Sequence, residues 1–178
     1  MKRHLFLTGS IGCGKSTAIT VALGEKITQC GGFLTRRYRD PYLHFTLESP
    51  DGNVKSTFLD FASGKPVVDL AVFSKNYLRG ETLVLDEIGG IELLNPEFAS
   101  ALEAVLSSGI PILGVLKGEG AAGALIDKLG LTEEYHWAAG NLRQQLYNDP
   151  NTLVYTCTQY DENALLLVRR WVEEYCHD

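Results

Sequence analysis

The sequence predicts an α/β fold in which a mainly parallel β-sheet is flanked by helices. Short apolar runs of the type buried on both faces alternate with segments of helical period. Each of the four clear runs is followed by a segment that can return as a helix, as right-handed crossovers require. The chain has 178 residues, of which 45% are hydrophobic and 21% charged. This length and composition suit one buried core, so residues 1–178 are expected to form a single domain.

The apolar runs give the expected strands in chain order. They read HLFLT at 4–8, TLVLDE at 82–87, PILGVL at 111–116 and TLVYTC at 152–157. A further run, EYHWA at 134–138, also predicts a strand, and it carries His136 and Trp137. Core packing is the preferred interpretation of these two side chains, and stacking on a base is the alternative.

Three segments carry the apolar period of amphipathic helices. The first follows the glycine-rich stretch at 9–17 and is expected to continue as a helix to Gly31-Gly32, with one face formed by Ile19, Ala22, Leu23, Ile27 and Cys30. The second begins with Asn95 as the N-cap and Pro96 at the first helical position, and Gly109 lies beyond its end. The third runs over about 161–175 and also has one apolar stripe.

A different pattern between the first helix and the second long strand predicts an antiparallel β-meander at 33–62. Its strands read GFLTRRY, YLHFTLE and VKSTFLDF, and SPDGN between the last two is a good hairpin turn. Arg36, Arg37 and Arg39 cluster on the first of them. We interpret this cluster as a charged edge strand that resists aggregation, while contact with an acidic second substrate or a nucleic acid is the alternative.

The stretch GSIGCGKS fits the phosphate-loop pattern G-x-x-x-x-G-K-[ST], with a strand before it and a helix after it. Glycines let the backbone fold so that its N–H groups converge on phosphate oxygens. Lys15 is expected to reach the β- and γ-phosphates, and the Ser16 hydroxyl to bind Mg²⁺. The nucleotide-binding residues expected here are Gly9, Ser10, Ile11, Gly12, Cys13, Gly14, Lys15, Ser16 and Thr17.

A phosphate loop needs an acidic residue near its metal ion, and the strand at 82–87 ends in Asp86 and Glu87. Asp86 is expected to hold Mg²⁺ together with Ser16. Glu87 is expected to point to another side of the strand and to orient or deprotonate the attacking water. Lys117 ends the next apolar run and is a candidate for a phosphate or water contact.

These motifs resemble a known family when they are taken together. HLFLTGSIGCGKST, GGFLTRRYR, VLDEIGGIELLNPEF and ILGVLKG are similar to the small nucleoside-triphosphatases that include the human cancer-related nucleoside-triphosphatase, with DEIGGIEL the most specific segment. The resemblance implies a RecA-like phosphate-loop fold with strands added at one side. It also implies Mg²⁺-dependent hydrolysis of ATP, GTP and other nucleoside triphosphates to the diphosphate.

The resemblance adds two residues to the expected site. Glu92 matches a second acidic position of the family and is expected near the site in a supporting role. Arg143, in GNLRQQL, matches a family arginine and is expected to neutralise charge on the transferred phosphoryl group, although a solvated arginine on a helix is the alternative. The family pattern is broken at Gly90, Ile91 and Leu142, and the stretch before Asp86 is short, which leaves base preference and water exclusion open.

Two other functions use the same loop. One is a nucleotide or small-molecule kinase, but KGEGAAGA at 117–124 lacks the arginines of a kinase lid, so water is the preferred acceptor. The other is a nucleotide-controlled regulatory module or an RNA-associated ATPase. A net charge of −6 and a pI near 5.2 argue against nucleic-acid binding, because affinity for a polyanion normally needs a basic surface.

Composition also bounds the setting of the protein. No apolar run approaches the length of a membrane span. The start of the chain, MKRHLFLTGS, has basic residues, but the apolar stretch that follows them is too short for a signal peptide. The four cysteines have no metal-ligand spacing and are expected to be reduced thiols. A cytoplasmic protein is therefore expected, with nucleoside triphosphate as its ligand and no membrane contact. The sequence indicates no protein partner, and it leaves the oligomeric state open between a monomer and an assembly.

Overall fold

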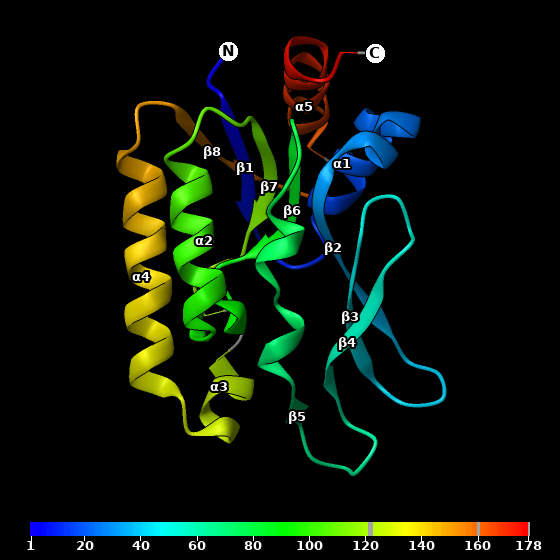
Figure 1. Ribbon diagram of the computed structural model, residues 1–178, viewed down its shortest axis with the longest axis vertical. Helices are drawn as coiled ribbons and strands as arrows, with labels where there is room; N and C mark the ends of the chain where they lie inside the picture. The colour runs from blue at the N-terminus through cyan, green and yellow to red at the C-terminus, as the bar shows by residue number, and fades with distance from the viewer. Residues whose placement is uncertain (121–122, 160, 178) are drawn as a thin grey trace.

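The computed structural model describes residues 1–120, 123–159 and 161–177, and within them eight strands form one sheet in the order β5-β4-β3-β2-β6-β7-β1-β8 (Figure 1). The central part is parallel and contains β2 (Gly31–Tyr38), β6 (Leu83–Ile88), β7 (Ile112–Leu116), β1 (His4–Gly9) and β8 (Thr152–Cys157). The antiparallel part adds β3 (His44–Glu48), β4 (Lys55–Asp60) and β5 (Val67–Val68). The predicted α/β class with an added meander is confirmed.

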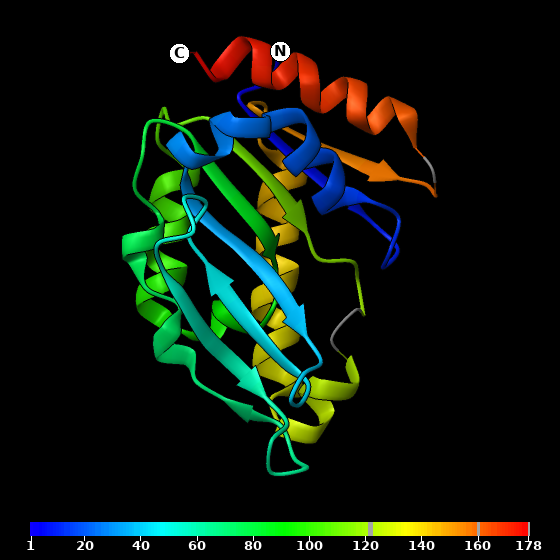
Figure 2. The ribbon, with the colours of Figure 1, turned by 90° about the vertical axis from the view of Figure 1, so that its right-hand side faces the viewer.

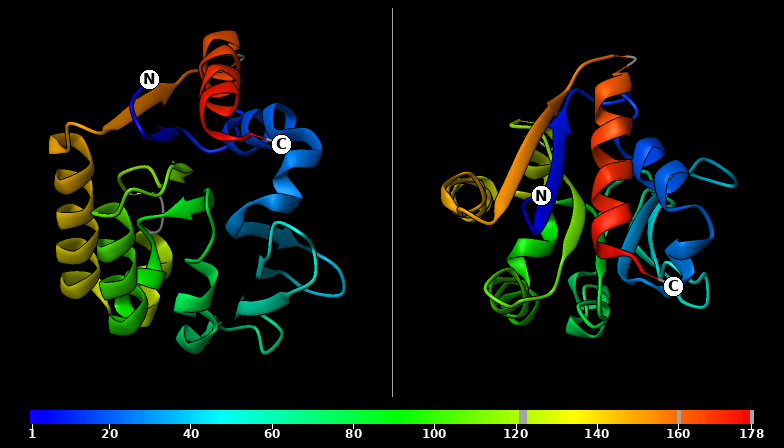
Figure 3. Two further views of the ribbon diagram at one scale, coloured as in Figure 1. Left: turned by 45° about the horizontal axis from the view of Figure 1, so that its top comes forward. Right: turned by 90° about the horizontal axis from the view of Figure 1, so that it is seen from above.

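Helices cover both faces of the sheet (Figure 3). On one face lie α1 (Lys15–Leu23) and α5 (Glu162–Tyr175), which pack over a cluster that includes Leu5, Val84 and Trp171. On the other face lie α2 (Pro96–Leu106), α3 (Gly123–Leu129) and α4 (Thr132–Asn148). The predicted cap is confirmed, because Asn95 accepts hydrogen bonds from the first turn of α2; in α5 the structure adds Asp161 as the N-cap, which accepts one from Ala164.

The first helix is shorter than predicted. The α-helix ends at Leu23, and a 3₁₀ helix follows over Gly24–Gln29. Gly24 has a φ of +53°, which terminates regular α-helix geometry there. The apolar period continues through Ile27 and Cys30 because the 3₁₀ turn keeps these side chains against the same cluster.

The segment EYHWA is not a strand, because residues 134–138 belong to α4. Tyr135, Leu142 and Leu146 form the buried side of α4 at offsets of seven and four. His136 and Trp137 lie on the other side, and Trp137 is 74% exposed. The prediction that both side chains pack in the core is therefore wrong. It failed because an apolar run this short does not distinguish a strand from a helix.

The strand β2 is an interior strand, which corrects the interpretation of its arginines as an edge. It pairs in parallel with β6 on one side and antiparallel with β3 on the other, so the meander extends the central sheet (Figure 2). This placement brings Arg36 close to Asp86 near the end of β6. No helix among the described residues has both the length and the apolar character that crossing a bilayer requires.

Gly32 is a test of the junction between the meander and the central sheet. It lies opposite Val84 of β6 at a φ of +102°, and a Cβ there would lie 1.9 Å from the Val84 carbonyl oxygen. We expect Gly32→Ala to lower the free energy of unfolding by at least about 2 kcal/mol, since backbone strain adds to the clash. Urea unfolding measures the effect. The control is Gly140→Ala, where a Cβ meets no neighbouring atom within 4 Å; equal stability of the two variants would contradict the expectation.

Candidate active site

The glycine-rich loop joins β1 to α1 at the carboxyl end of the parallel strands. Gly12 and Gly14 have φ values of +80° and +94°, which residues with a Cβ rarely adopt. The Lys15 Nζ donates to the carbonyl oxygens of Gly9 at 3.0 Å and Ser10 at 2.7 Å. These bonds hold the ammonium group across the loop. Cys13 is buried beneath it, with its Sγ 3.4 Å from the same Nζ.

Ser16 and Asp86 meet although they are 70 residues apart. The Ser16 Oγ donates to the Asp86 Oδ1 at 2.7 Å, and the Asp86 side chain is 3% exposed. Burial raises the pKa of Asp86 to about 6, above the ordinary range of an aspartate, while the bond from Ser16 and the charge of Arg36 act in the opposite direction. The structure thus joins the two residues that the sequence predicted as metal ligands.

Asp86 and Glu87 lie in an irregularity of β6. Leu85 pairs with Gly114 of β7, and Ile88 pairs with Leu116. β6 therefore advances three residues where β7 advances two, which is the register shift of a β-bulge. Glu87 has a φ of +68°, a conformation that costs free energy for a residue with a Cβ. Consecutive side chains in a regular strand point to opposite faces, so a bulge of this kind re-aims one of them. Both carboxylates therefore face one cavity, which corrects the expectation that Glu87 points to another side.

A cavity of about 1040 Å³ connects the loop, the acidic pair and the meander. Its walls include the loop residues Gly9, Ser10, Ile11, Gly12, Gly14, Lys15, Ser16 and Thr17, together with Asp86, Glu87 and Lys117. The Lys117 Nζ lies 3.7 Å from the Glu87 Oε2. The sequence-predicted residues are thus assembled around one space, with the exceptions of Cys13, Glu92 and Arg143, which do not line it.

Glu92 supports the turn that follows the acidic pair. Its carboxylate accepts hydrogen bonds from the N–H groups of Gly89 at 2.5 Å and of Gly90 at 2.8 Å, and burial raises its pKa. A Cβ on Gly90 would lie 2.9 Å from the Glu92 Oε2 and 3.4 Å from the Lys117 Nζ. A larger residue at position 90 would therefore collide with Glu92 and crowd Lys117, and glycine avoids both contacts.

Arg36 is a member of the site that sequence reasoning missed. Its Nη1 lies 3.6 Å from the Asp86 Oδ2, on the opposite side of the carboxylate from Ser16. The neighbouring Thr35 donates from its Oγ1 to the Asp86 carbonyl oxygen at 2.8 Å. The signal was in the sequence as a cluster of arginines, but assigning it required the parallel pairing of β2 with β6.

A family model places this site among known proteins. The model of a family described as NTPase matches residues 4–149 of the chain. The chain belongs to this NTPase family. Over 132 residues it is 27% identical to nucleoside-triphosphatase THEP1 of Methanocaldococcus jannaschii, covering 64% of this chain and 77% of the relative. It is 30% identical over 145 residues to the mouse cancer-related nucleoside-triphosphatase homolog, with 65% and 76% covered.

The overall fold of this NTPase also matches a solved structure. The crystal structure of THEP1 from Aquifex aeolicus aligns with a TM-score of 0.61 and 14% identity, over 98% of this chain and 99% of the other. The identity is low, so this match supports the fold and nothing more specific. The predicted family and its phosphate-loop fold are confirmed.

Arg143 of this NTPase contacts Lys117 and does not reach the cavity. Its Nη2 donates to the Lys117 carbonyl oxygen at 2.6 Å from the middle of α4. Lys117 in turn faces Glu87, so Arg143 fixes the backbone that carries this lysine. Its predicted direct role on the phosphoryl group stays a prediction.

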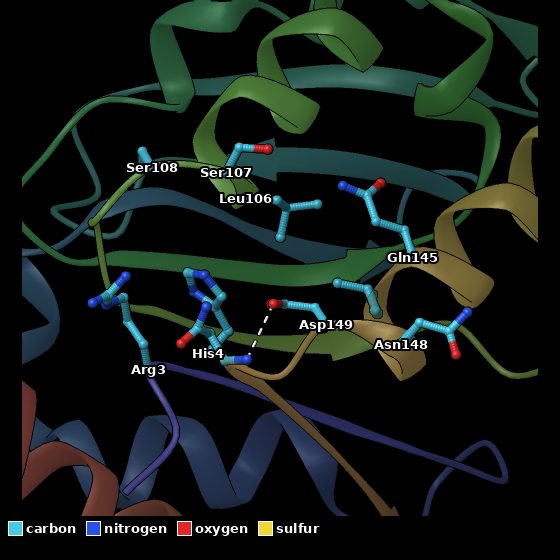
Figure 4. A pocket seen from close by; sticks show the side chains of 10 residues that line it. Arg3, His4, Leu106, Ser107, Ser108, Gln145, Asn148 and Asp149 are labelled. Atoms are coloured by element: carbon cyan, nitrogen blue, oxygen red, sulfur yellow. Dashed lines mark hydrogen bonds between the residues drawn. The ribbon is translucent and has the colours of Figure 1, made fainter.

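A second, smaller pocket of about 400 Å³ lies at the amino-terminal ends of the parallel strands, where β1 and β8 begin (Figure 4). The side chains of Arg3, His4 and Asp149 lie close together there. His4 is 1% exposed, burial lowers its pKa, and its Nδ1 has no hydrogen-bond partner within the described residues. Because phosphate-loop chemistry takes place at the opposite edge, this pocket is separate from the NTPase site.

Proposed function

We propose that this NTPase hydrolyses nucleoside 5′-triphosphates, ATP and GTP among them, to the diphosphate and phosphate with the help of Mg²⁺. The observation that carries the proposal is that Asp86 and Glu87, at the bulge in β6, both line the cavity that the phosphate loop also lines. The family and the names of its relatives support the same reaction class. We further propose that residues 1–178 work as one domain, as a cytoplasmic monomer without a nucleic-acid partner.

The residues of the site fit Mg²⁺. This ion prefers oxygen ligands and binds through one or two carboxylates together with substrate phosphates. The Ser16 hydroxyl and the Asp86 carboxylate are such oxygens, and they are 2.7 Å apart beside the loop. A bound Mg²⁺ would neutralise negative charge on the phosphates.

The remaining steps belong to side chains of this chain. Loop N–H groups and Lys15 bind the β- and γ-phosphates and balance charge as the bond to the leaving oxygen breaks. Glu87 orients the attacking water and accepts its proton, and Lys117 beside it holds the carboxylate in place. Glu92 and Arg143 keep the two backbone segments that carry these groups fixed.

An assay of products tests the proposal. ATP, GTP, CTP and UTP are each incubated with the protein and Mg²⁺, and the nucleotide product and phosphate are quantified. We expect one phosphate and one diphosphate for each triphosphate consumed. Release of pyrophosphate and a monophosphate, or no consumption of any triphosphate, would contradict it.

Arg36 is expected to weaken metal binding before the nucleotide arrives. A positive charge 3.6 Å from a buried carboxylate opposes a second cation there, although partial exposure of Arg36 reduces the effect. We expect Arg36→Ala to bind Mn²⁺, a spectroscopic substitute for Mg²⁺, roughly 3- to 10-fold more tightly than the wild type. Electron paramagnetic resonance of free Mn²⁺ at pH 8 and without nucleotide measures this.

The control for this measurement is Arg39→Ala, which removes an exposed arginine just beyond β2. It should leave Mn²⁺ affinity unchanged. Equal or weaker Mn²⁺ binding by Arg36→Ala would show that the arginine does not oppose the metal.

A further inference from the structure

The cavity extends beyond the acidic pair onto the β-meander, and the phosphate chemistry does not use this extension. We name it the meander lobe, defined by the lining residues Arg37, Leu43, Phe45, Phe58, Leu59 and Phe61. These residues come from β2, β3 and β4 and from the segments adjoining them. The lobe is therefore available to a ligand other than the phosphates, and its lining defines which ligand fits.

Aromatic rings and one cation dominate the lobe. The rings of Phe45 and Phe58 are 6.3 Å apart between centroids, and the guanidinium carbon of Arg37 lies 5.7 Å from the Phe45 ring. Phe45 and Phe61 are only half-buried, so the parts of these rings that stay exposed can contact a further planar group. Within the described part of the chain, no carboxylate forms an ion pair with Arg37. A ring that carries an anionic group complements this lining.

Strand order places the lobe on one side of the γ-phosphate. The phosphate loop follows β1, Glu87 ends β6, and Arg37 and Phe45 lie on β2 and β3. Along the carboxyl edge the order is therefore loop, Glu87, meander lobe. In phosphoryl transfer the attacking and leaving oxygens are roughly in line. The attacking group comes from the Glu87 side, so the nucleoside of the triphosphate extends away from the lobe.

We propose that the meander lobe is a second ligand site, which binds a nucleoside 5′-monophosphate beside the bound triphosphate. Its base packs on the exposed parts of the Phe45 and Phe61 rings, and its phosphate pairs with Arg37, whose planar guanidinium suits phosphate oxygens. This proposal rests on the proposed function, because Glu87 defines the side of attack. A ligand there stands where water approaches, so it controls access of water to the γ-phosphate.

Calorimetry on the triphosphate-loaded protein tests the second site. The protein is saturated with Mg²⁺ and a non-hydrolysable triphosphate analogue, and AMP, GMP, CMP and UMP are titrated in turn. We expect at least one monophosphate to bind one-to-one without displacing the analogue. Arg37→Ala should weaken that binding at least tenfold, because a charge-assisted bond to phosphate is lost. Phe45→Ala should weaken it as well, and Arg39→Ala should bind as the wild type does.

Three results would overturn the second site. They are a loaded protein that binds none of the four monophosphates, a monophosphate that binds only by displacing the analogue, and unchanged binding by Arg37→Ala. The second of these would mean that the lobe holds the base of the triphosphate itself. Phosphate release by the wild type without any monophosphate is measured in parallel, so failure of the proposed hydrolysis is seen separately. Circular dichroism confirms that each variant is folded.

Discussion

Lys15→Ala is expected to lower phosphate release from nucleoside triphosphates by at least about 100-fold. The Nζ of Lys15 is held over the loop by the carbonyl oxygens of Gly9 and Ser10, where the β- and γ-phosphates are expected. Removing one preorganised donor from a site of developing charge costs about 10²- to 10³-fold in turnover. Steady-state phosphate release at saturating triphosphate measures the loss.

The matched control for the loop is Lys65→Ala, which removes an exposed lysine in the turn before β5. It should release phosphate at the wild-type rate. If Lys15→Ala also kept the wild-type rate, the loop would not be the site of the reaction.

Glu87→Gln is expected to reduce turnover by about 10²- to 10⁴-fold, the contribution of a positioned general base. Glutamine keeps the shape of the side chain but cannot accept a proton from water. The backbone of Glu87 already lies at a φ of +68°, and the substitution leaves that geometry to the bulge. Binding of a non-hydrolysable triphosphate should persist. Phosphate release and calorimetry together separate the loss of chemistry from a loss of binding.

Glu103→Gln provides the comparison, since Glu103 is an exposed carboxylate on α2. Turnover by this variant should equal that of the wild type. Undiminished turnover by Glu87→Gln would mean that another group activates the water.

The sequence predicts much of this fold because the strongest signals are local. Four apolar runs lie in the central sheet with boundaries within one residue of those expected, and Asn95 caps α2 as the sequence predicts. The strand prediction for EYHWA failed because five residues of mixed polarity fit both the period of a strand and the period of a helix. Only packing of the whole of α4, with Tyr135 inward and Trp137 outward, decides between them.

The site was predictable as a set of residues, and much less so as a geometry. Lys15, Ser16, Asp86 and Glu87 carry motif signals, and the structure gathers them around one cavity. The bulge that turns Glu87 inward depends on the register between β6 and β7, which no local pattern encodes. The pairing of Arg36 with Asp86 likewise depends on β2 lying next to β6.

Hydrolysis in water enriched in ¹⁸O tests the central claim most directly, because that claim is attack by water on the γ-phosphorus beside Glu87. After a single turnover with ATP and Mg²⁺, mass spectrometry locates the heavy oxygen. The account predicts one ¹⁸O in the released phosphate and none in ADP. Heavy oxygen in the nucleotide product would place the attack at another phosphorus and contradict the arrangement of Lys15, Asp86 and Glu87 described above.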